Sequence, residues 1–493
     1  MAHLPEYTPV LIVGAGISGL GAAAHLKAQC PGRDFCVIDS KTDLGGTWLT
    51  HRYPGVRSDS DLYTYGYRFK PWRGKPIAEG PLIMNYLRDM SVEHHLGPHL
   101  FFGWQLTEAS WCSTSALWRV RLTEVESGQQ RTLSCQFLWM CQGYYRHDTP
   151  NLPDFPGRES FKGPIIHPQD WPDDLELKGK RVIVIGSGAT AATLIPNIAD
   201  DCEQVTMLQR SPAYFYVGGN RNELAEQLDA LDIPPEWTHE ITRRQLLKDQ
   251  QALHQVANEY PEVVAEELIN GVQAILGEDF DVDSHFRPAY RPWQQRIAYL
   301  PDGDLFHAIA RGDVNVVTAH IDRFEANGIR TTEGNLIPAD IVISATGFQL
   351  SVMGDVAFDV DGVPVDFGQC HTYLGIMISD VPNMAAMFGY LRTSWTMRVD
   401  LVSDFVCRLL NTLEEDGLSW CMPSPPEAET IADARPWIAA EDFSPSYLRK
   451  SIHKMPKQGS DLPWINLTDY YVEREVLPTI DLKDGALLFG GSR

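Results

Sequence analysis

The chain has 493 residues, more than one ordinary hydrophobic core accommodates, so we expect two to four folding units. Its hydrophobic fraction of 44% and charged fraction of 22% are typical of a soluble globular protein and exclude a fibrous or disordered one. A net charge of -24 would repel phosphate backbones, which argues against nucleic acid as a partner.

The amino-terminal segment, MAHLPEYTPVLIVGAG, lacks the basic region and small-residue cleavage site of a signal peptide. No stretch has the roughly 18 uncharged apolar residues that a membrane span needs. We therefore expect a cytoplasmic protein with no stable membrane insertion. The nine cysteines are scattered without a CxxC pair or a Cys/His cluster, so we expect them to be reduced and to bind no metal.

The first predicted unit is a strand, a helix and a strand. Pro9 to Gly14 reads PVLIVG, a buried strand ending at glycine, and GISGLGAAAHLKAQ and FCVIDS follow as helix and strand. Gly14, Gly16 and Gly19 form GxGxxG at the first turn, and Asp39 ends the second strand. Such glycines let backbone N–H groups approach a pyrophosphate, and the carboxylate accepts ribose hydroxyls. This unit predicts a dinucleotide site.

The same order of elements recurs at Lys180, where KRVIVIGSGATAATLIPNIADDCEQVTMLQRS predicts another strand, glycine turn, helix and strand. The residues expected to contact this second nucleotide are Gly186, Ser187, Gly188, Thr190, Ala191, Arg210 and Ser211. An arginine after the second strand can bind a 2'-phosphate through two parallel hydrogen bonds, which a carboxylate would repel. We therefore expect NADPH here; the alternative is that Arg210 is an ordinary surface arginine.

Helical patterns dominate between about Gly219 and Asp283, and we expect this stretch to pack against the second domain. Its apolar positions, at steps of three and four, are Val264, Leu268, Val272 and Ile275. The segment from Asp340 to Phe348, DIVISATGF, predicts a late strand and a turn back to the first domain. A later amphipathic helix has a face expected in the core, formed by Val399, Val402, Val406, Leu409 and Leu413.

The predicted fold is α/β, with two Rossmann-like dinucleotide-binding domains, the second inserted in the first, and a helical insert. We expect the first domain to contain 1–145 and 345–493, the second 146–218 and 286–344, and the helical insert 219–285. An acidic first site and a basic second site predict FAD in the first domain and NADPH in the second. Hydride transfer between them serves disulfide reductases, oxidases and oxygenases alike. A disulfide reductase needs a cysteine pair where this chain has GGTWLTHRYPG.

Two motifs carry a resemblance to a known family. The segment FKGPIIHPQDWP fills FxGxxxHxxxWP with Phe161, Gly163, His167, Trp171 and Pro172. The pattern GGxWxxxxYPGxxxD is filled by Gly45, Gly46, Trp48, Tyr53, Pro54, Gly55 and Asp59. The chain thereby resembles type I Baeyer-Villiger monooxygenases of the flavin-containing monooxygenase superfamily over nearly its whole length, and is most similar to the ethionamide-activating branch.

The resemblance implies FAD and NADPH as cofactors. It places beside them, in addition to the glycine turns, Gly46, Thr47, Trp48, Asp59, Tyr65 and Gly347. It also implies that His167 lies on the link between the two domains, where it coordinates motion and is not a proton shuttle. Trp171 and Pro172 are expected to stiffen the same hinge.

The resemblance further implies a catalytic arginine after a Pro-Trp segment. Here this is Arg296 in PWQQR, with Asp59 orienting it, although Arg287 and Arg291 lie close enough in sequence to compete for the role. Most relatives carry a lysine immediately before the arginine, and this chain has Gln295. That contact with the NADPH phosphate is therefore missing.

The implied reaction converts a small ketone to an ester or lactone with O2 and NADPH, through a peroxide at flavin C4a, and oxidises sulfides or thioamides. A fixed cation beside the flavin would stabilise the oxyanion, which is the role expected of Arg296. We expect the helical insert and the residues near Tyr390 and Trp395 to close the site against water. The alternatives are a flavin monooxygenase that oxygenates amines or sulfides without ketone activity, an uncoupled NADPH oxidase and a non-catalytic scaffold. The particular substrate and the oligomeric state stay open.

Overall fold

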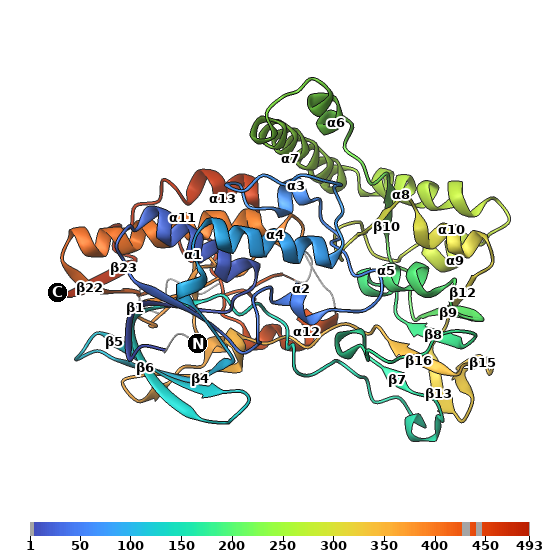
Figure 1. The fold of residues 1–493 in the computed structure, drawn as a ribbon, viewed down its shortest axis with the longest axis horizontal. Helices are drawn as coiled ribbons and strands as arrows, with labels where there is room; N and C mark the ends of the chain where they lie inside the picture. Colours follow the sequence, from blue (N-terminus) through green and yellow to red (C-terminus); the bar gives the residue numbers. More distant parts are fainter. Residues whose placement is uncertain (1–3, 426–433, 440–445, 493) are drawn as a thin grey trace.

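The computed structural model describes residues 4–425, 434–439 and 446–492, and it contains two α/β bodies in one chain (Figure 1). The first body contains a nine-stranded sheet in the order β18-β17-β4-β5-β6-β1-β2-β3, with β21 also paired to β6. Its strands are β1 (Tyr7–Val13), β2 (Phe35–Asp39), β3 (Leu100–Phe102), β4 (Trp104–Cys112), β5 (Leu117–Glu124), β6 (Gln130–Met140), β17 (Ala357–Val360), β18 (Val363–Pro364) and β21 (Met384–Ala386).

The core of the first body forms around β1, which runs parallel to β2 on one side and to β6 on the other. Helix α1 (Ile17–Gln29) follows β1 and packs against α11 (Trp395–Glu415). Small residues in α1 allow this close approach, because a Cβ added at Gly21 would lie 2.7 Å from Val399 Cγ1. The predicted first strand–helix–strand unit is confirmed, and all five residues of the predicted apolar face of α11 are buried.

The second body contains a five-stranded, all-parallel sheet in the order β12-β9-β8-β16-β7. Its strands are β7 (Ile165–Ile166), β8 (Arg181–Ile185), β9 (Gln204–Gln209), β12 (Val314–Thr318) and β16 (Ile341–Ser344). Helices α5 (Ala189–Ile198) and α10 (Asp304–Ala310) pack together beside it. A three-stranded sheet of β13 (Ile321–Glu325), β14 (Gly328–Thr331) and β15 (Leu336–Pro338) contributes Phe324 and Ile329 to a cluster with Ile183 and Val342.

The chain leaves the first sheet after β6, builds the second body and returns after β16, so the second body is an insertion in the first. The sheet of the first body is mixed and that of the second is parallel, and each has a glycine turn between a parallel strand and the helix that follows it, which confirms the predicted fold class. Further helices are α2 (Thr47–Thr50), α3 (Leu62–Tyr65), α4 (Gly80–Glu93), α12 (Ser446–Ser451) and α13 (Tyr470–Val476). Three pairs of strands form separate small sheets: β10 (Phe215–Gly218) with β11 (Ala298–Pro301), β19 (Thr372–Tyr373) with β20 (Met377–Ile378), and β22 (Leu418–Pro423) with β23 (Leu487–Ser492).

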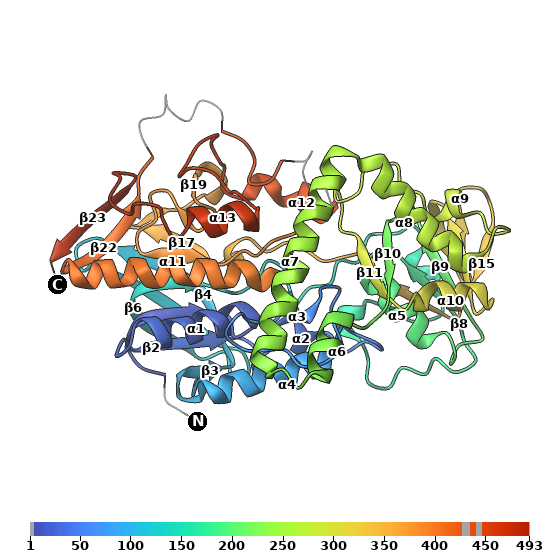
Figure 2. The same cartoon turned by 90° about the horizontal axis from the view of Figure 1, so that it is seen from above.

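The segment expected to be helical contains α6 (Glu223–Ala230), α7 (Pro235–Glu259), α8 (Pro261–Leu276) and α9 (Val282–Phe286). The expectation that all of it packs against the second body is wrong. Helix α8 contacts α10 and β10, but α7 contacts α3 of the first body. Figure 2 shows α7 lying along the first body while α8 turns toward the second. The cause is the break at Tyr260, whose backbone is not helical and which precedes Pro261.

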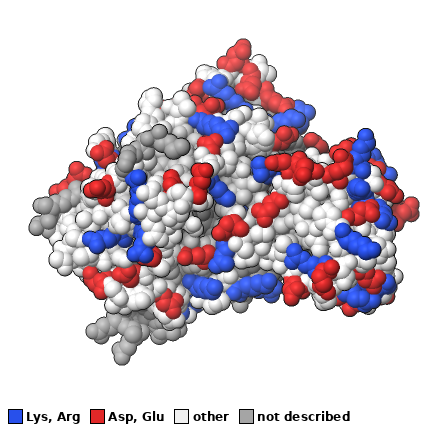
Figure 3. All heavy atoms as spheres, turned by 60° about the horizontal axis from the view of Figure 1, so that its bottom comes forward, with Lys and Arg blue, Asp and Glu red and all other residues white. Residues whose placement is uncertain are grey.

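Charged side chains of both signs are intermingled on the face shown in Figure 3. All nine cysteines are free thiols. Within the described ranges, no helix combines the length and the apolar character needed to cross a bilayer. No group of three His, Cys, Asp or Glu side chains in those ranges is arranged to hold a metal ion.

Candidate active site

The first glycine turn joins β1 to α1 and lies tightly against the residues that follow β6. Gly14 has a φ of 107°, and a Cβ added there would lie 2.5 Å from the carbonyl oxygen of Cys141. A Cβ added at Gly19 would lie 1.8 Å from the carbonyl oxygen of Gly14, so only glycine lets the helix start this close to the strand. Gly16 is the N-cap residue of α1 and has no side chain to occupy the first amides of the helix. These amides can therefore bind a phosphate.

Gly46 faces this turn and completes a backbone cradle. A Cβ added at Gly46 would lie 2.9 Å from Gly16 Cα, so any side chain would force the two loops apart. Asp39, at the end of β2, accepts hydrogen bonds from the backbone N–H of Ala15 at 2.7 Å and of Lys41 at 2.9 Å. Burial raises the pKa of the Asp39 carboxyl, and the two backbone hydrogen bonds oppose this shift. The cradle fits the pyrophosphate of a dinucleotide, and the carboxylate fits a ribose hydroxyl.

An aromatic pair stands beside the cradle. Trp48, in α2, donates from Nε1 to the Tyr65 hydroxyl at 3.0 Å, and the two rings meet edge to face with centroids 6.0 Å apart. Thr47, at the start of α2, is exposed. Burial raises the pKa of the Tyr65 phenol well above its usual range, so it stays neutral. The pair can form an apolar wall next to a bound cofactor.

The second glycine turn joins β8 to α5. Gly186 has a φ of 128°, and a Cβ added there would lie 2.4 Å from the carbonyl oxygen of Ala345. Gly188, the N-cap residue of α5, has open space where a Cβ would be. The Ser187 hydroxyl donates to the carbonyl oxygen of Ser211 at 3.4 Å. This open turn at a helix N-terminus fits a second pyrophosphate.

The predicted residues next to the second turn differ in exposure. Ala191 is fully buried, and Thr190 hydrogen-bonds the phenol of Tyr53, whose pKa is raised by burial to about 12. Arg210 follows β9 and is exposed. In the part of the chain that the structure describes, no carboxylate forms an ion pair with Arg210. Its guanidinium is therefore available to a phosphate group.

Arg296 and Asp59 meet although they are 237 positions apart. The Arg296 Nε donates to Asp59 Oδ2 at 2.7 Å and Nη2 donates to Oδ1 at 2.9 Å, which is a forked, bidentate pair. The two side chains are 43% and 25% exposed, so the pair opens to a solvent-accessible space. Arg287, the competing candidate, forms ion pairs with Glu266 and Asp283 instead.

The fingerprint segment ties the second body to the connection between the bodies. Phe161 is buried, and a Cβ added at Gly163 would lie 2.0 Å from the carbonyl oxygen of Asp340. His167 is buried; its Nε2 donates to the carbonyl oxygen of Gly347 at 3.0 Å. Burial lowers the pKa of His167, and the bond to Gly347 opposes this shift, so the ring is neutral at physiological pH.

The two chain connections between the bodies are bonded to each other near this histidine. The backbone N–H of Arg146 donates to the carbonyl oxygen of Gln349 at 2.9 Å, and Tyr145 and Leu350 form an antiparallel bridge. Trp171 packs against the core of the second body, and Pro172 is half-buried. His167 therefore lies at the joint, whereas Phe161 and Trp171 pack within the second body.

Sequence reasoning missed an aromatic cluster at the same joint. Tyr144 stacks on Trp395 with ring centroids 5.2 Å apart, and Tyr145 lies 4.7 Å from Phe348. Phe388 joins them from the chain after β21. The available signal was that Tyr144 and Tyr145 follow β6, because ligands in parallel sheets bind outside the carboxyl ends of the strands.

The residues near Tyr390 and Trp395 were expected to help close the site against water, and for Tyr390 this expectation is wrong. Tyr390 is 2% exposed and its hydroxyl donates to Glu473, which also pairs with the buried Arg398. A side chain fixed by an interior ion pair cannot open and close over a site. Trp395, by contrast, is half-buried and donates from Nε1 to the Ser18 hydroxyl at 2.7 Å, beside the first glycine turn.

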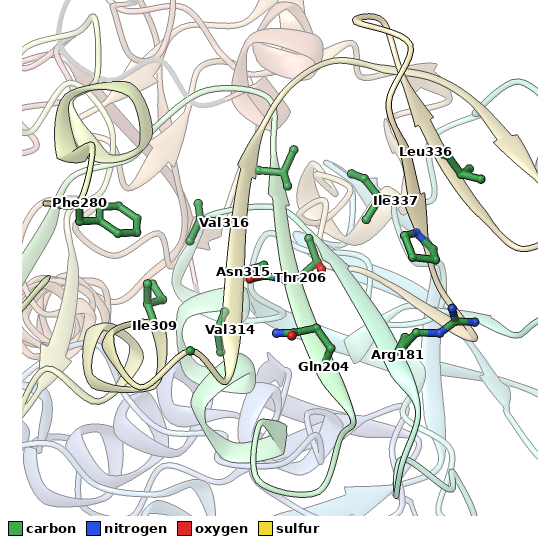
Figure 4. Close-up of a pocket in the computed structure, with 13 residues that line it drawn as sticks. Arg181, Gln204, Thr206, Phe280, Ile309, Val314, Asn315, Val316, Leu336 and Ile337 are labelled. Atoms are coloured by element: carbon green, nitrogen blue, oxygen red, sulfur yellow. The ribbon is translucent and has the colours of Figure 1, made fainter.

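A cavity of about 540 Å³ lies elsewhere, beside β12 in the second body (Figure 4). Its lining includes Val314, Asn315 and Val316 from β12, and Gln204 and Thr206 from β9. None of the predicted site residues lines it, although the structure describes all of them. This cavity is separate from the candidate site.

The fold and the two glycine turns define a protein with two dinucleotide-binding domains. Residues 80–218 match the family described as flavin-binding monooxygenase-like, and residues 12–69 match an NAD(P)-binding Rossmann-like domain. The FAD-containing monooxygenase EthA of Mycobacterium tuberculosis is 40% identical over 488 residues, which cover 99% of this chain and 98% of that protein. The chain belongs to the flavin-binding monooxygenase-like family.

Solved structures show the same fold. A steroid monooxygenase bound to NADP has a TM-score of 0.77 at 23% identity and covers 98% of this chain and 99% of its own. A cyclohexanone monooxygenase from Rhodococcus sp. Phi1 bound to NADP+ has a TM-score of 0.75 at 22% identity, with 99% and 100% covered. The two-domain architecture is therefore common to all three.

Proposed function

We propose that this protein is an NADPH- and O2-dependent FAD monooxygenase that converts ketones to esters or lactones and also oxidises sulfides or thioamides. The observation that carries the proposal is the bidentate Arg296–Asp59 pair, which fixes a permanent cation at an accessible position. Support comes from family membership and from two structural neighbours named for ketone and steroid oxygenation.

Each nucleotide has residues that fit it. Gly14, Gly16, Gly46 and Asp39 would hold FAD through the backbone cradle and the ribose-binding carboxylate. Gly186, Ser187 and Gly188 would hold the NADPH pyrophosphate, with Arg210 at the 2'-phosphate. FAD, when bound, supplies the hydride acceptor and the place at which O2 is activated.

Arg296 would act on the substrate carbonyl. Nucleophilic attack on a ketone turns its oxygen into an oxyanion, and a guanidinium fixed nearby stabilises that charge without reorganising during the reaction. Asp59 holds the plane of the guanidinium through two hydrogen bonds, so it is a positioning residue in this scheme. Sulfide oxidation creates no carbonyl oxyanion and should depend on Arg296 much less.

The aromatic residues would keep water from the reacting atoms. Trp48 and Tyr65 would form one wall, and the stacked rings of Tyr144 and Trp395 another. Exclusion of water strengthens every electrostatic interaction inside a site and protects a reactive oxygen species from side reactions. His167 would hold the joint of the two bodies through its bond to Gly347.

The test is a panel of ketones and thioethers incubated with the FAD-loaded protein, NADPH and air. Products are identified by mass, and hydrogen peroxide is measured in parallel. We expect ester or lactone from ketones and sulfoxide from thioethers, each coupled to NADPH consumption. Sulfoxide without any ester would exclude the ketone reaction, and peroxide equal to NADPH whatever the substrate would indicate an uncoupled oxidase.

A further inference from the structure

Helix α3 follows Asp59 closely and contains Tyr65, but it has only four residues. A helix this short cannot be stable alone, because the first turn costs more than its hydrogen bonds return. Its end also leaves backbone carbonyls without partners inside the helix. The position of α3 therefore depends on groups from other elements.

Side chains from α7 and α11 satisfy these carbonyls. Arg243 Nη1, from α7, lies within hydrogen-bonding distance of three carbonyl oxygens, those of Tyr63 at 3.1 Å, Thr64 at 3.1 Å and Gly66 at 3.3 Å. The Thr396 hydroxyl, from α11, lies 2.6 Å from the carbonyl oxygen of Tyr65. Every carbonyl from position 63 to position 66 thus has a donor from outside α3.

The arginine is in the interior. Arg243 is 5% exposed, and a buried guanidinium is costly unless it is paired and hydrogen-bonded. Its Nη2 lies 3.9 Å from Oδ2 of Asp400, which is itself 2% exposed. The same carboxyl group accepts from His25 Nε2 at 2.8 Å and from the backbone N–H of Arg68 at 3.2 Å. The charge is therefore balanced by a network that joins α1, α7 and α11.

The three carbonyls that Arg243 approaches flank Tyr65, whose hydroxyl accepts from Trp48 beside the glycine cradle. We propose that Arg243 is a positioning residue through which helix α7 holds Tyr65 and Trp48 in place for FAD binding. This inference rests on the proposed function, since it takes FAD as the ligand of the cradle. It gives the inserted helices a task in the first body, although the chain reaches them from the second.

The test compares Arg243→Met and Arg243→Lys with a matched control, Arg244→Met. Arg244 is the next residue on α7, but its side chain is 78% exposed, and its ion-pair partner among the described residues is Glu240, one turn away. Two measurements are made: FAD affinity, by titration of the apoprotein, and backbone hydrogen exchange of peptides covering 58–68. Exchange reports on α3 directly and needs no enzymatic activity.

We expect Arg243→Met to weaken FAD binding at least about tenfold, which corresponds to about 1.4 kcal/mol. Exchange should accelerate in 58–68 while β1 and α11 stay protected. Arg243→Lys keeps the charge with fewer aligned donors, so its changes in FAD affinity and exchange should be smaller. Arg244→Met should have the FAD affinity and exchange rates of the wild type.

The inference would be overturned if Arg243→Met bound FAD and exchanged its amide hydrogens as the wild type does. Faster exchange throughout the first body would also overturn it, because that result indicates a general loss of stability. If Arg243→Met does not fold, wild-type exchange in both Arg243→Lys and Thr396→Val would overturn it instead. A wild-type protein that binds no FAD would refute the proposed function, whereas the exchange of 58–68 in the apoprotein would still test Arg243.

Discussion

Replacing Arg296 by alanine should separate catalysis from stability. The Arg296–Asp59 pair is 43% and 25% exposed, and exposed ion pairs contribute about 0.2–1 kcal/mol to the free energy of unfolding. For a chain this long such a loss lowers the melting temperature by about 2 °C or less. The removal of one group that stabilises an oxyanion slows the reaction far more, by about 100- to 1,000-fold.

The assay uses FAD-loaded Arg296→Ala with NADPH and air, with a ketone and a thioether in separate reactions. We expect ester formation to fall by about two to three orders of magnitude, while flavin reduction continues and sulfoxide formation falls much less. Arg287→Ala is the control, because Arg287 forms its ion pairs with Glu266 and Asp283 and not with Asp59. Wild-type ester formation in Arg296→Ala, or an equal loss in the control, would refute this reasoning.

Three further outcomes follow from the geometry. Arg210→Ala should raise KM for NADPH about tenfold or more and leave KM for NADH nearly unchanged, since only NADPH carries the 2'-phosphate; equal changes would show that Arg210 does not bind it. Gly46→Ala should yield nearly colourless protein, because the new Cβ would lie 2.9 Å from Gly16 Cα at a φ of 55°; a fully flavin-loaded variant would contradict the cradle. Burial alone would raise the pKa of Asp404, but hydrogen bonds, chiefly from His25, lower it from 3.8 to about 2. A carboxyl group whose pKa is lower in the folded than in the unfolded state stabilises the fold at pH values above the unfolded pKa, and this contribution is lost as the pH falls from 3.8 toward 2. Asp404→Asn lacks this group, so its free energy of unfolding should fall less than that of the wild type across the same interval. Acid unfolding followed by circular dichroism measures the difference.

Local sequence patterns predicted the parts of the fold that depend on local physics. The run PVLIVG and the glycines that follow it specify β1 and the start of α1, because strand burial and the glycine turn are both encoded within a few residues. The 3.6-residue period identified the buried faces of α8 and α11 for the same reason. The two glycine turns then gave the fold class.

Contacts between segments far apart in the chain could not be predicted from local sequence patterns. Arg243 lies in a largely polar helix and would be taken for a surface residue, yet its partners at Tyr63 and Thr64 are about 180 positions earlier. Tyr390 was misplaced in the same way, since the Glu473 that holds it in the interior is 83 positions away. Burial of a polar group depends on partners that only the tertiary fold supplies.

Some residues of the candidate site could also be predicted from local sequence patterns, and others could not. The glycines and Asp39 could be placed by spacing, because a turn, a helix start and a strand end are adjacent in the chain. Arg296 and Asp59 came from the resemblance to a family, and their contact across 237 positions follows only from the way the two bodies meet. The aromatic cluster of Tyr144 and Trp395 brings together two segments whose proximity no local period indicates.

The close packing of α1 against α11 also bears on how the protein is made. His25 and Asp400, which join the two helices, are 375 positions apart, so the ribosome releases α1 long before its partner. The inserted body has every strand of its own sheet once β16 has emerged and is free to fold first. Until α11 follows, the nascent first body exposes an apolar helix face, which makes it a natural client for chaperones during translation.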